Sequence, residues 1–258
     1  MLSPDALQDY SAQGFLSPLD LLSPDKAVDY RRRLEKFEEQ RGGPLSGNFR
    51  HKMHLLLVWV DELMRTPTLL DAVESILGPD ILCWNSNFFI KEAHSPDYVS
   101  WHQDATYWGL GTENVVSAWV ALSDSSVNSG CMRVSPGSHQ QQLHHIDTDS
   151  PDNIVARGQE IFPPIDESTA INIELRPGQF SLHNVLIAHA SKPNQSDDRR
   201  IGLAFRYTAT SVRQHEKFKD SAALVRGSDS YGHFIAEPRP RENMQTDMID
   251  LHNTVTTQ

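Results

Sequence analysis

Two histidine-x-aspartate segments are the first candidates for chemistry, His102-Gln-Asp104 and His145-Ile-Asp147. In a β-strand, residues i and i+2 point to the same face, so each segment could direct an imidazole nitrogen and a carboxylate oxygen at one ion. These are two of the three ligands of a 2-His-1-carboxylate metal site. The first segment is flanked by tryptophans, which suits the water-excluding wall of a cavity, whereas the second lies in the polar stretch 140–153. We therefore expect His102 and Asp104 to be the ligands.

The third ligand must come from a distant segment, and the candidates are His183 and His189. They are six residues apart and would share one face of an uninterrupted strand, so periodicity does not choose between them. Arg200 follows His189 across the turn-rich loop 192–198. A strand, a loop and a returning strand would bring Arg200 beside His189, where a guanidinium suits the far carboxylate of a 2-oxo acid. This spacing favours His189 as the ligand, and it favours Arg200 over Arg199 as the anion-binding arginine.

The elements that position these residues begin with helices. A serine followed by proline is typical of a helix N-terminus, and it occurs at Ser3-Pro4 and at Ser23-Pro24. The second of these helices should end at Gly42-Gly43. Further helices are expected over residues 54–64 and 68–77, so the first third of the chain is predicted to be helical.

The character of the chain changes after residue 80, where short runs rich in Val, Ile, Phe and Trp are separated by turns. Strands are expected over residues 81–90, 114–122, 170–175, 179–185 and 201–208. Helices followed by strands predict helices packed on a β-sandwich or barrel, not an alternating βαβ fold. After about Lys217 the chain is a polar tail, for which a lid, an interface and plain packing remain open. We expect its end past Met248 to be disordered.

The overall composition excludes several classes of function. The 258 residues carry a net charge of -11, which argues against nucleic acid and anionic membranes as partners. No apolar run is long enough to span a bilayer, and the N-terminus lacks the features of a signal peptide, so we expect a cytoplasmic protein. The cysteines, Cys83 and Cys131, are expected to be free buried thiols. A monomer and a homodimer are both compatible with the sequence.

Four segments, in order, resemble those of the phytanoyl-CoA dioxygenase superfamily of iron(II)/2-oxoglutarate oxygenases. They are Trp101-His-Gln-Asp104, Ala118-Trp-Val-Ala-Leu122, Asn128-Ser-Gly-Cys-Met-Arg-Val-Ser-Pro-Gly-Ser-His139, and His189-Ala-Ser191 followed by Asn194 and Arg200. The resemblance covers about residues 8 to 210. Ala190 departs from the pattern, because the family usually has glycine there.

The resemblance implies a single oxygenase domain over residues 1–258, mainly β with flanking helices. Its core would be a double-stranded β-helix, the jelly roll of cupin-like proteins. The helical part would span about 1–78, the core about 79–210, and a wrapping or lid segment about 211–258. The resemblance also implies that iron(II) is held by the catalytic residues His102, Asp104 and His189.

The same resemblance implies 2-oxoglutarate and O2 as cosubstrates. Their binding site would contain Arg200 at the 5-carboxylate of 2-oxoglutarate, with Ser191, Trp119 and Asn87 nearby. Related halogenases have Ala or Gly where this chain has Asp104, so hydroxylation is the expected reaction. A small or medium organic metabolite would be hydroxylated at an unactivated C–H, while 2-oxoglutarate is converted to succinate and CO2.

Other functions and roles remain open at this point. A cupin-like metal-dependent isomerase or hydrolase would not need Arg200, and a non-catalytic ligand-binding barrel would keep the pocket without turnover. His183, Arg206 and the pair Tyr107-Trp108 would contact a substrate or pack in the core. His51 and His54 have helical spacing and are expected at the surface.

Overall fold

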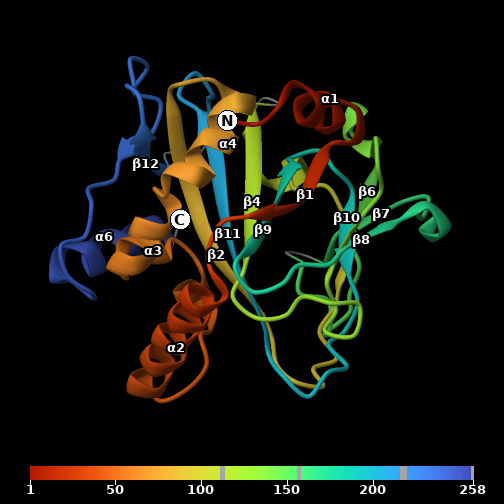
Figure 1. Ribbon diagram of the computed structural model, residues 1–258, viewed down its shortest axis with the longest axis horizontal. Helices are drawn as coiled ribbons and strands as arrows, with labels where there is room; N and C mark the ends of the chain where they lie inside the picture. The colour runs from red at the N-terminus through yellow and green to blue at the C-terminus, as the bar shows by residue number, and fades with distance from the viewer. Residues whose placement is uncertain (111–113, 156–157, 216–219, 257–258) are drawn as a thin grey trace.

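The structure is a computed structural model that describes residues 1–110, 114–155, 158–215 and 220–256, without the side chain of Tyr107 (Figure 1). Two sheets form the core. The large sheet has the strand order β1-β9-β4-β11-β2-β12-β13, and the smaller one has the order β3-β10-β5-β8. Figure 1 shows α2, α3, α4 and α6 on one side of the molecule, and α1 and the small sheet on the other. This is the predicted jelly-roll core with flanking helices.

The helices of the first third begin where the sequence predicted. Helices α1 (Pro4–Gln13) and α2 (Pro24–Arg41) each start after a serine whose hydroxyl accepts a backbone N–H, and each ends at a left-handed glycine. Helix α4 (Pro67–Leu77) also agrees with the prediction. The segment predicted as one helix over 54–64 is instead a short 3-10 turn, Met53–Leu55, followed by α3 (Val58–Met64). The C-terminal segment takes up backbone groups at this break: Asn243 Oδ1 accepts from the N–H of Val58, and the N–H of Met244 donates to the carbonyl oxygen of Leu56.

All five predicted strands are present. They are β2 (Ile81–Lys91), β4 (Val115–Ala121), β8 (Ile171–Ile173), β9 (Gln179–Asn184) and β11 (Arg200–Ala209). The small sheet also contains β3 (Val99–His102), β5 (Met132–Val134) and β10 (His189–Ser191), and the strands β6 (His145–Ile146) and β7 (Glu160–Ile161) form a separate pair.

Strand β11 shows how the large sheet separates the core from the site. Its residues Ile201, Leu203, Phe205 and Tyr207 belong to the main apolar cluster, together with side chains of α2, α3 and α4. Because side chains alternate across a strand, Arg200, Ala204 and Arg206 point to the opposite face, where they line a cavity. The helices therefore fix the sheet from outside, and its inner face is left for a ligand.

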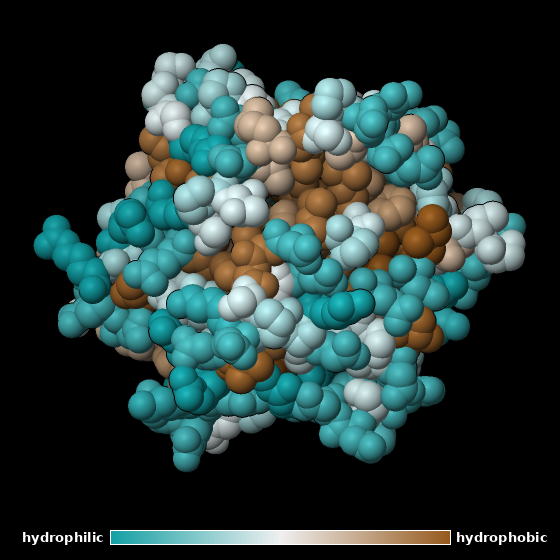
Figure 2. Space-filling view, in the orientation of Figure 1, coloured by the Kyte–Doolittle hydropathy of each residue, from teal (hydrophilic) through white to brown (hydrophobic). Residues whose placement is uncertain are grey.

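Strand β1 (Phe15–Asp20) was not predicted; it pairs with β9 at the end of the large sheet. The strand contains Pro18, which has no N–H to donate, so it suits only an edge position. Its residues Phe15, Leu16 and Leu19 are half-buried. Figure 2, drawn in the same orientation as Figure 1, shows apolar side chains near the middle of the face turned to the viewer, surrounded by hydrophilic ones.

The C-terminal segment is more ordered than predicted. Strand β12 (Ser221–Arg226) extends the large sheet beside β2, β13 (Ile235–Ala236) pairs with β12, and α6 (Thr246–Thr256) occupies the end that was expected to be disordered. Glu237 anchors this segment, because its buried carboxylate bonds to Lys52 Nζ and to His54 Nε2, both at 2.7 Å. His54 is 1% exposed, so its predicted surface position is wrong. No helix among the residues described has the length and apolar character that crossing a membrane requires.

Candidate metal centre

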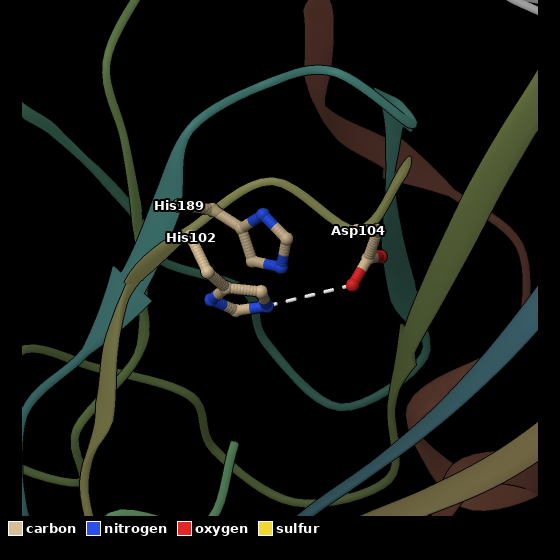
Figure 3. Close-up of side chains that lie close together, drawn as sticks. All are labelled: His102, Asp104 and His189. Carbon is tan, nitrogen blue, oxygen red and sulfur yellow. Dashed lines mark ion pairs between the residues drawn. The ribbon is translucent and has the colours of Figure 1, made fainter. Parts of the chain in front are cut away.

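His102, Asp104 and His189 converge on one point (Figure 3). Strands β3 and β10 are antiparallel neighbours, and His102 and His189 are direct cross-strand partners. One nitrogen of each ring and one carboxylate oxygen all lie within 4.8 Å of one another. His183, the other candidate for the third position, is not in this group, and its ring centroid lies 5.4 Å from that of His189.

Asp104 reaches this point by a turn and not by strand alternation. Strand β3 ends at His102, and Asp104 has helical backbone angles just before the short helix α5 (Ala105–Trp108). Its Oδ1 lies 3.4 Å from His102 Nε2. The i, i+2 spacing therefore selected two residues that do converge, although the second one belongs to a turn.

The two imidazoles are oriented to bind a metal ion through Nε2. His102 Nδ1 lies 2.8 Å from the carbonyl oxygen of Ser100, and His189 Nδ1 lies 3.0 Å from that of Ile187. A carbonyl only accepts hydrogen bonds, so each Nδ1 carries the proton and each Nε2 keeps its lone pair. Two such nitrogens and one carboxylate are the donor set of non-haem iron(II) sites with open positions. The residues present thus fit a ferrous ion.

The electrostatics of the site favour the ligand forms of these groups. Burial acts to raise the pKa of Asp104, but the contact with His102 and the electrostatic interactions with His189 and Arg206 outweigh it and hold this pKa well below its usual range. Burial and the neighbouring His102 lower the pKa of His189 to about 4. At neutral pH the carboxyl is therefore ionised and His189 is neutral, as metal binding requires.

Gln103, between two of the candidate ligands, joins their separate segments. Its side-chain N–H groups donate to the carbonyl oxygens of Gln141 and Leu186, and its Oε1 accepts from the N–H of Leu143. Leu186 lies just before His189, so this fully buried amide ties the two sides of the site together. The backbone N–H of Gln103 donates to His145 Nε2 at 3.0 Å. His145 is thus half-buried behind the site, although it lies in the polar stretch 140–153.

A cavity of about 640 Å3 lies over the three residues. Its lining includes all four residues expected around the cosubstrate, which are Arg200, Ser191, Trp119 and Asn87, and also His183, Arg206 and Trp108. The Asn87 amide bonds to His51 Nδ1, and His51 lines the cavity as well. The side chain of Tyr107 lies outside the described residues.

Arg200 is a buried cation that faces this cavity without an acidic partner among the residues described. It is 3% exposed, its Nη1 donates to the carbonyl oxygen of Gly130 at 2.6 Å, and its Nε has no hydrogen-bond partner. Burial lowers the pKa of Arg200 to about 10, so it stays charged at neutral pH. Arg199, in contrast, binds Glu38 and Glu92. A buried charge is costly unless it is paired, which favours an anionic ligand at Arg200.

Lys91, the cross-strand partner of Arg200, is a residue that the sequence analysis missed. Its Nζ donates to Ser191 Oγ at 2.7 Å and to the carbonyl oxygen of Lys192. Burial, with a contribution from Arg200, lowers the pKa of Lys91 to about 6. Because Ser191 Oγ accepts from Lys91, its own hydroxyl proton is left to donate toward the cavity.

Gly202 was also missed, and its role is to make room for Trp119. A Cβ at Gly202 would overlap the Cζ2 and Cε2 atoms of the Trp119 indole. Trp119 is 6% exposed and lies 5.5 Å from the Arg200 guanidinium carbon, measured to the ring centroid. Glycine at position 202 therefore leaves the space that the Trp119 indole occupies beside Arg200.

Replacing Gly202 with alanine should lower the free energy of unfolding by about 1–3 kcal/mol, because the new methyl group must displace a buried indole. Urea denaturation measures this change. Trp119→Phe lacks the two overlapping atoms. The double variant should therefore lose less unfolding free energy than the sum of the losses in the two single variants. Additive costs would contradict the packing described here.

Comparison with known proteins gives the family. A sequence profile of the phytanoyl-CoA dioxygenase (PhyH) family matches residues 10–202. A probable alpha-ketoglutarate-dependent hypophosphite dioxygenase from Stutzerimonas stutzeri is 27% identical over 161 residues, which are 62% of this chain and 56% of that protein. An ectoine dioxygenase from Streptomyces coelicolor is 27% identical over 55% of each chain. This chain thus spans about half the length of the curated relatives it matches.

Solved structures extend the similarity over nearly the whole chain. A non-heme monooxygenase, ThoJ in its apo form, has a TM-score of 0.86 and 34% identity, and the match covers 97% of this chain and 94% of that one. CytC3 with Fe(II) and alpha-ketoglutarate has a TM-score of 0.72 at 23% identity over 95% of this chain and 96% of that one, which shows the shared fold. The profile covers most of the chain and spans the three converging residues, so this protein belongs to the phytanoyl-CoA dioxygenase family.

Proposed function

We propose that this protein is an iron(II)- and 2-oxoglutarate-dependent dioxygenase that hydroxylates an unactivated C–H of a small or medium organic metabolite, with succinate and CO2 as coproducts. One observation carries the proposal. A 2-His-1-carboxylate set and a buried arginine without an acidic partner among the described residues line the same cavity. Residues 1–258 act as one oxygenase unit in this proposal, since the C-terminal strand β12 joins the sheet that carries Arg200.

In this function His102, Asp104 and His189 hold the iron, which supplies the oxygen chemistry when it is bound. All three residues line the cavity, which would give the other ligands of the ion access to it. Their two imidazoles are fixed by the carbonyl oxygens of Ser100 and Ile187, so the site is oriented before metal binds.

The cosubstrate would be held by Arg200 and Ser191. The Arg200 guanidinium forms charge-assisted hydrogen bonds with the 5-carboxylate of 2-oxoglutarate. Ser191 donates its hydroxyl proton to the same carboxylate, because Lys91 already donates to Ser191 Oγ. Trp119 covers the site next to Arg200 and excludes water from it. A cupin-like isomerase or hydrolase would have no use for this anion site, which is why the oxygenase is preferred.

Two anaerobic measurements test the proposal. Adding 2-oxoglutarate to the iron(II)-loaded protein should produce the weak visible charge-transfer band of an iron-bound 2-oxo acid, and the zinc(II)-loaded protein should show no band. Admitting O2 should then convert 2-oxoglutarate to succinate. A protein that binds iron but shows neither the band nor succinate would rule the proposal out.

A further inference from the structure

A row of polar residues crosses the inner face of the large sheet. Asn85 on β2 is the cross-strand partner of Arg206 on β11, Arg206 is the partner of Ser117 on β4, and Ser117 is the partner of His183 on β9. All four side chains line the cavity over the candidate metal site. The inner face of a sheet normally carries apolar side chains, so four polar residues in register indicate a ligand.

Arg206 is the charged member of this row. It is only 7% exposed, and its Nε and Nη1 atoms have no hydrogen-bond partner among the described residues. Its guanidinium carbon lies 4.7 Å from the ring centroid of Trp108 and 5.4 Å from that of Phe89. These rings contact the cation, but they provide no hydrogen-bond acceptor for the N–H groups in the plane of the guanidinium. Asp104 acts on Arg206 through its charge, but Nε and Nη1 still lack an acceptor, and burying donors without an acceptor is unfavourable.

The polar neighbours of Arg206 are unsatisfied too. Ser117 Oγ and His183 Nδ1 are buried and have no hydrogen-bond partner among the residues described. A single ligand group with more than one oxygen could bond to the guanidinium and to one of these atoms together. A carboxylate has that shape, and it matches the paired N–H groups of an arginine.

Arg206 and Arg200 lie on the same face of β11 but in different surroundings. Arg200 lies beside Trp119, with Gly130 as its hydrogen-bond acceptor, whereas Arg206 lies between Trp108 and Phe89. Six residues of strand separate them, which corresponds to about 20 Å between their backbone positions. If the first receives 2-oxoglutarate, the second is available to a different anion.

We propose that Arg206 binds a carboxylate of the substrate, so that the metabolite hydroxylated by this protein is a small organic acid. The inference rests on the proposed function, which assigns Arg200 to the cosubstrate. Ser117 and His183 complete the carboxylate site, and Trp108 and Phe89 keep water from the guanidinium. The acid then enters the cavity at a fixed position relative to His102, Asp104 and His189.

Binding to the manganese(II)-loaded protein, saturated with 2-oxoglutarate, tests the proposal without turnover. The probes are L-amino acids, hydroxy acids and simple carboxylic acids, each compared with its primary amide by thermal shift and calorimetry. At least one acid should bind about tenfold or more tightly than its amide. Arg206→Gln should abolish this preference, and Arg206→Lys should retain part of it. Arg213→Gln, at an exposed arginine, should leave it unchanged.

Several results would overturn the proposal. One is a panel in which no acid binds better than its amide, and this comparison on the unmodified protein decides the matter even if the Arg206 variants do not fold. Another is an Arg206→Gln protein in which 2-oxoglutarate affinity falls as far as in an Arg200 variant, because Arg206 would then serve the cosubstrate. Failure of the unmodified protein to bind 2-oxoglutarate at all would instead reject the proposed function.

Discussion

Replacing Asp104 with alanine should abolish hydroxylation. Asp104 provides the only carboxylate oxygen in the group of three converging residues, and no other acid among the described residues joins that group. Loss of supporting partners around a metal ligand already costs about 10–100-fold in affinity, so loss of the ligand should weaken iron(II) binding by more than about 100-fold. Competition titration with a chelator measures the affinity, and succinate formation measures the activity.

The matched control is Asp147→Ala. Asp147 belongs to the second histidine-x-aspartate segment, is exposed, and lies outside the converging group. Its replacement should leave iron affinity within about twofold of the unmodified protein. If both variants lose iron equally, or if Asp104→Ala still hydroxylates, the ligand set proposed here is wrong.

Much of this site could be predicted because its residues carry local signals. His102 and Asp104 have tryptophans around them and a two-residue spacing, and Arg200 opens a strand whose apolar residues alternate from Ile201 to Tyr207. That alternation already indicates one face for the core and the other for a cavity. The choice of His189 over His183 depended on the position of Arg200, and the structure brings only His189 into the group.

The missed residues have no local signal, because their roles depend on distant neighbours. In the sequence, Ile90-Lys91-Glu92 resembles a solvated strand end, yet Lys91 is fully buried against Ser191, one hundred residues away. Gly202 resembles a weak point in a strand, and only the position of Trp119 on the neighbouring strand explains it. His54 is buried because Glu237 returns to it from the C-terminal segment. Periodicity describes which face a residue occupies, but not which remote group it meets.

Arg200 is the second residue whose loss should have a large effect, and the effect should fall on 2-oxoglutarate and not on the metal. In Arg200→Gln the carboxylate of the cosubstrate would lose the buried cation that is proposed to bind it. Removing one partner of a buried, hydrogen-bonded charge pair costs about 2–5 kcal/mol, so the dissociation constant of 2-oxoglutarate should rise by about 30-fold or more. Titration of the iron(II) charge-transfer band measures it.

Arg199→Gln is the control that separates charge from position, since the two arginines are adjacent in the chain. Arg199 forms ion pairs with Glu38 and Glu92, and its side chain does not line the cavity. Its loss leaves the buried Glu38 without that cation, so it should lower stability while 2-oxoglutarate affinity stays within about twofold. Iron affinity should be unchanged in both variants, because neither side chain is in the converging group. Equal losses of 2-oxoglutarate affinity in the two variants would mean that net positive charge, and not the buried guanidinium of Arg200, attracts the cosubstrate.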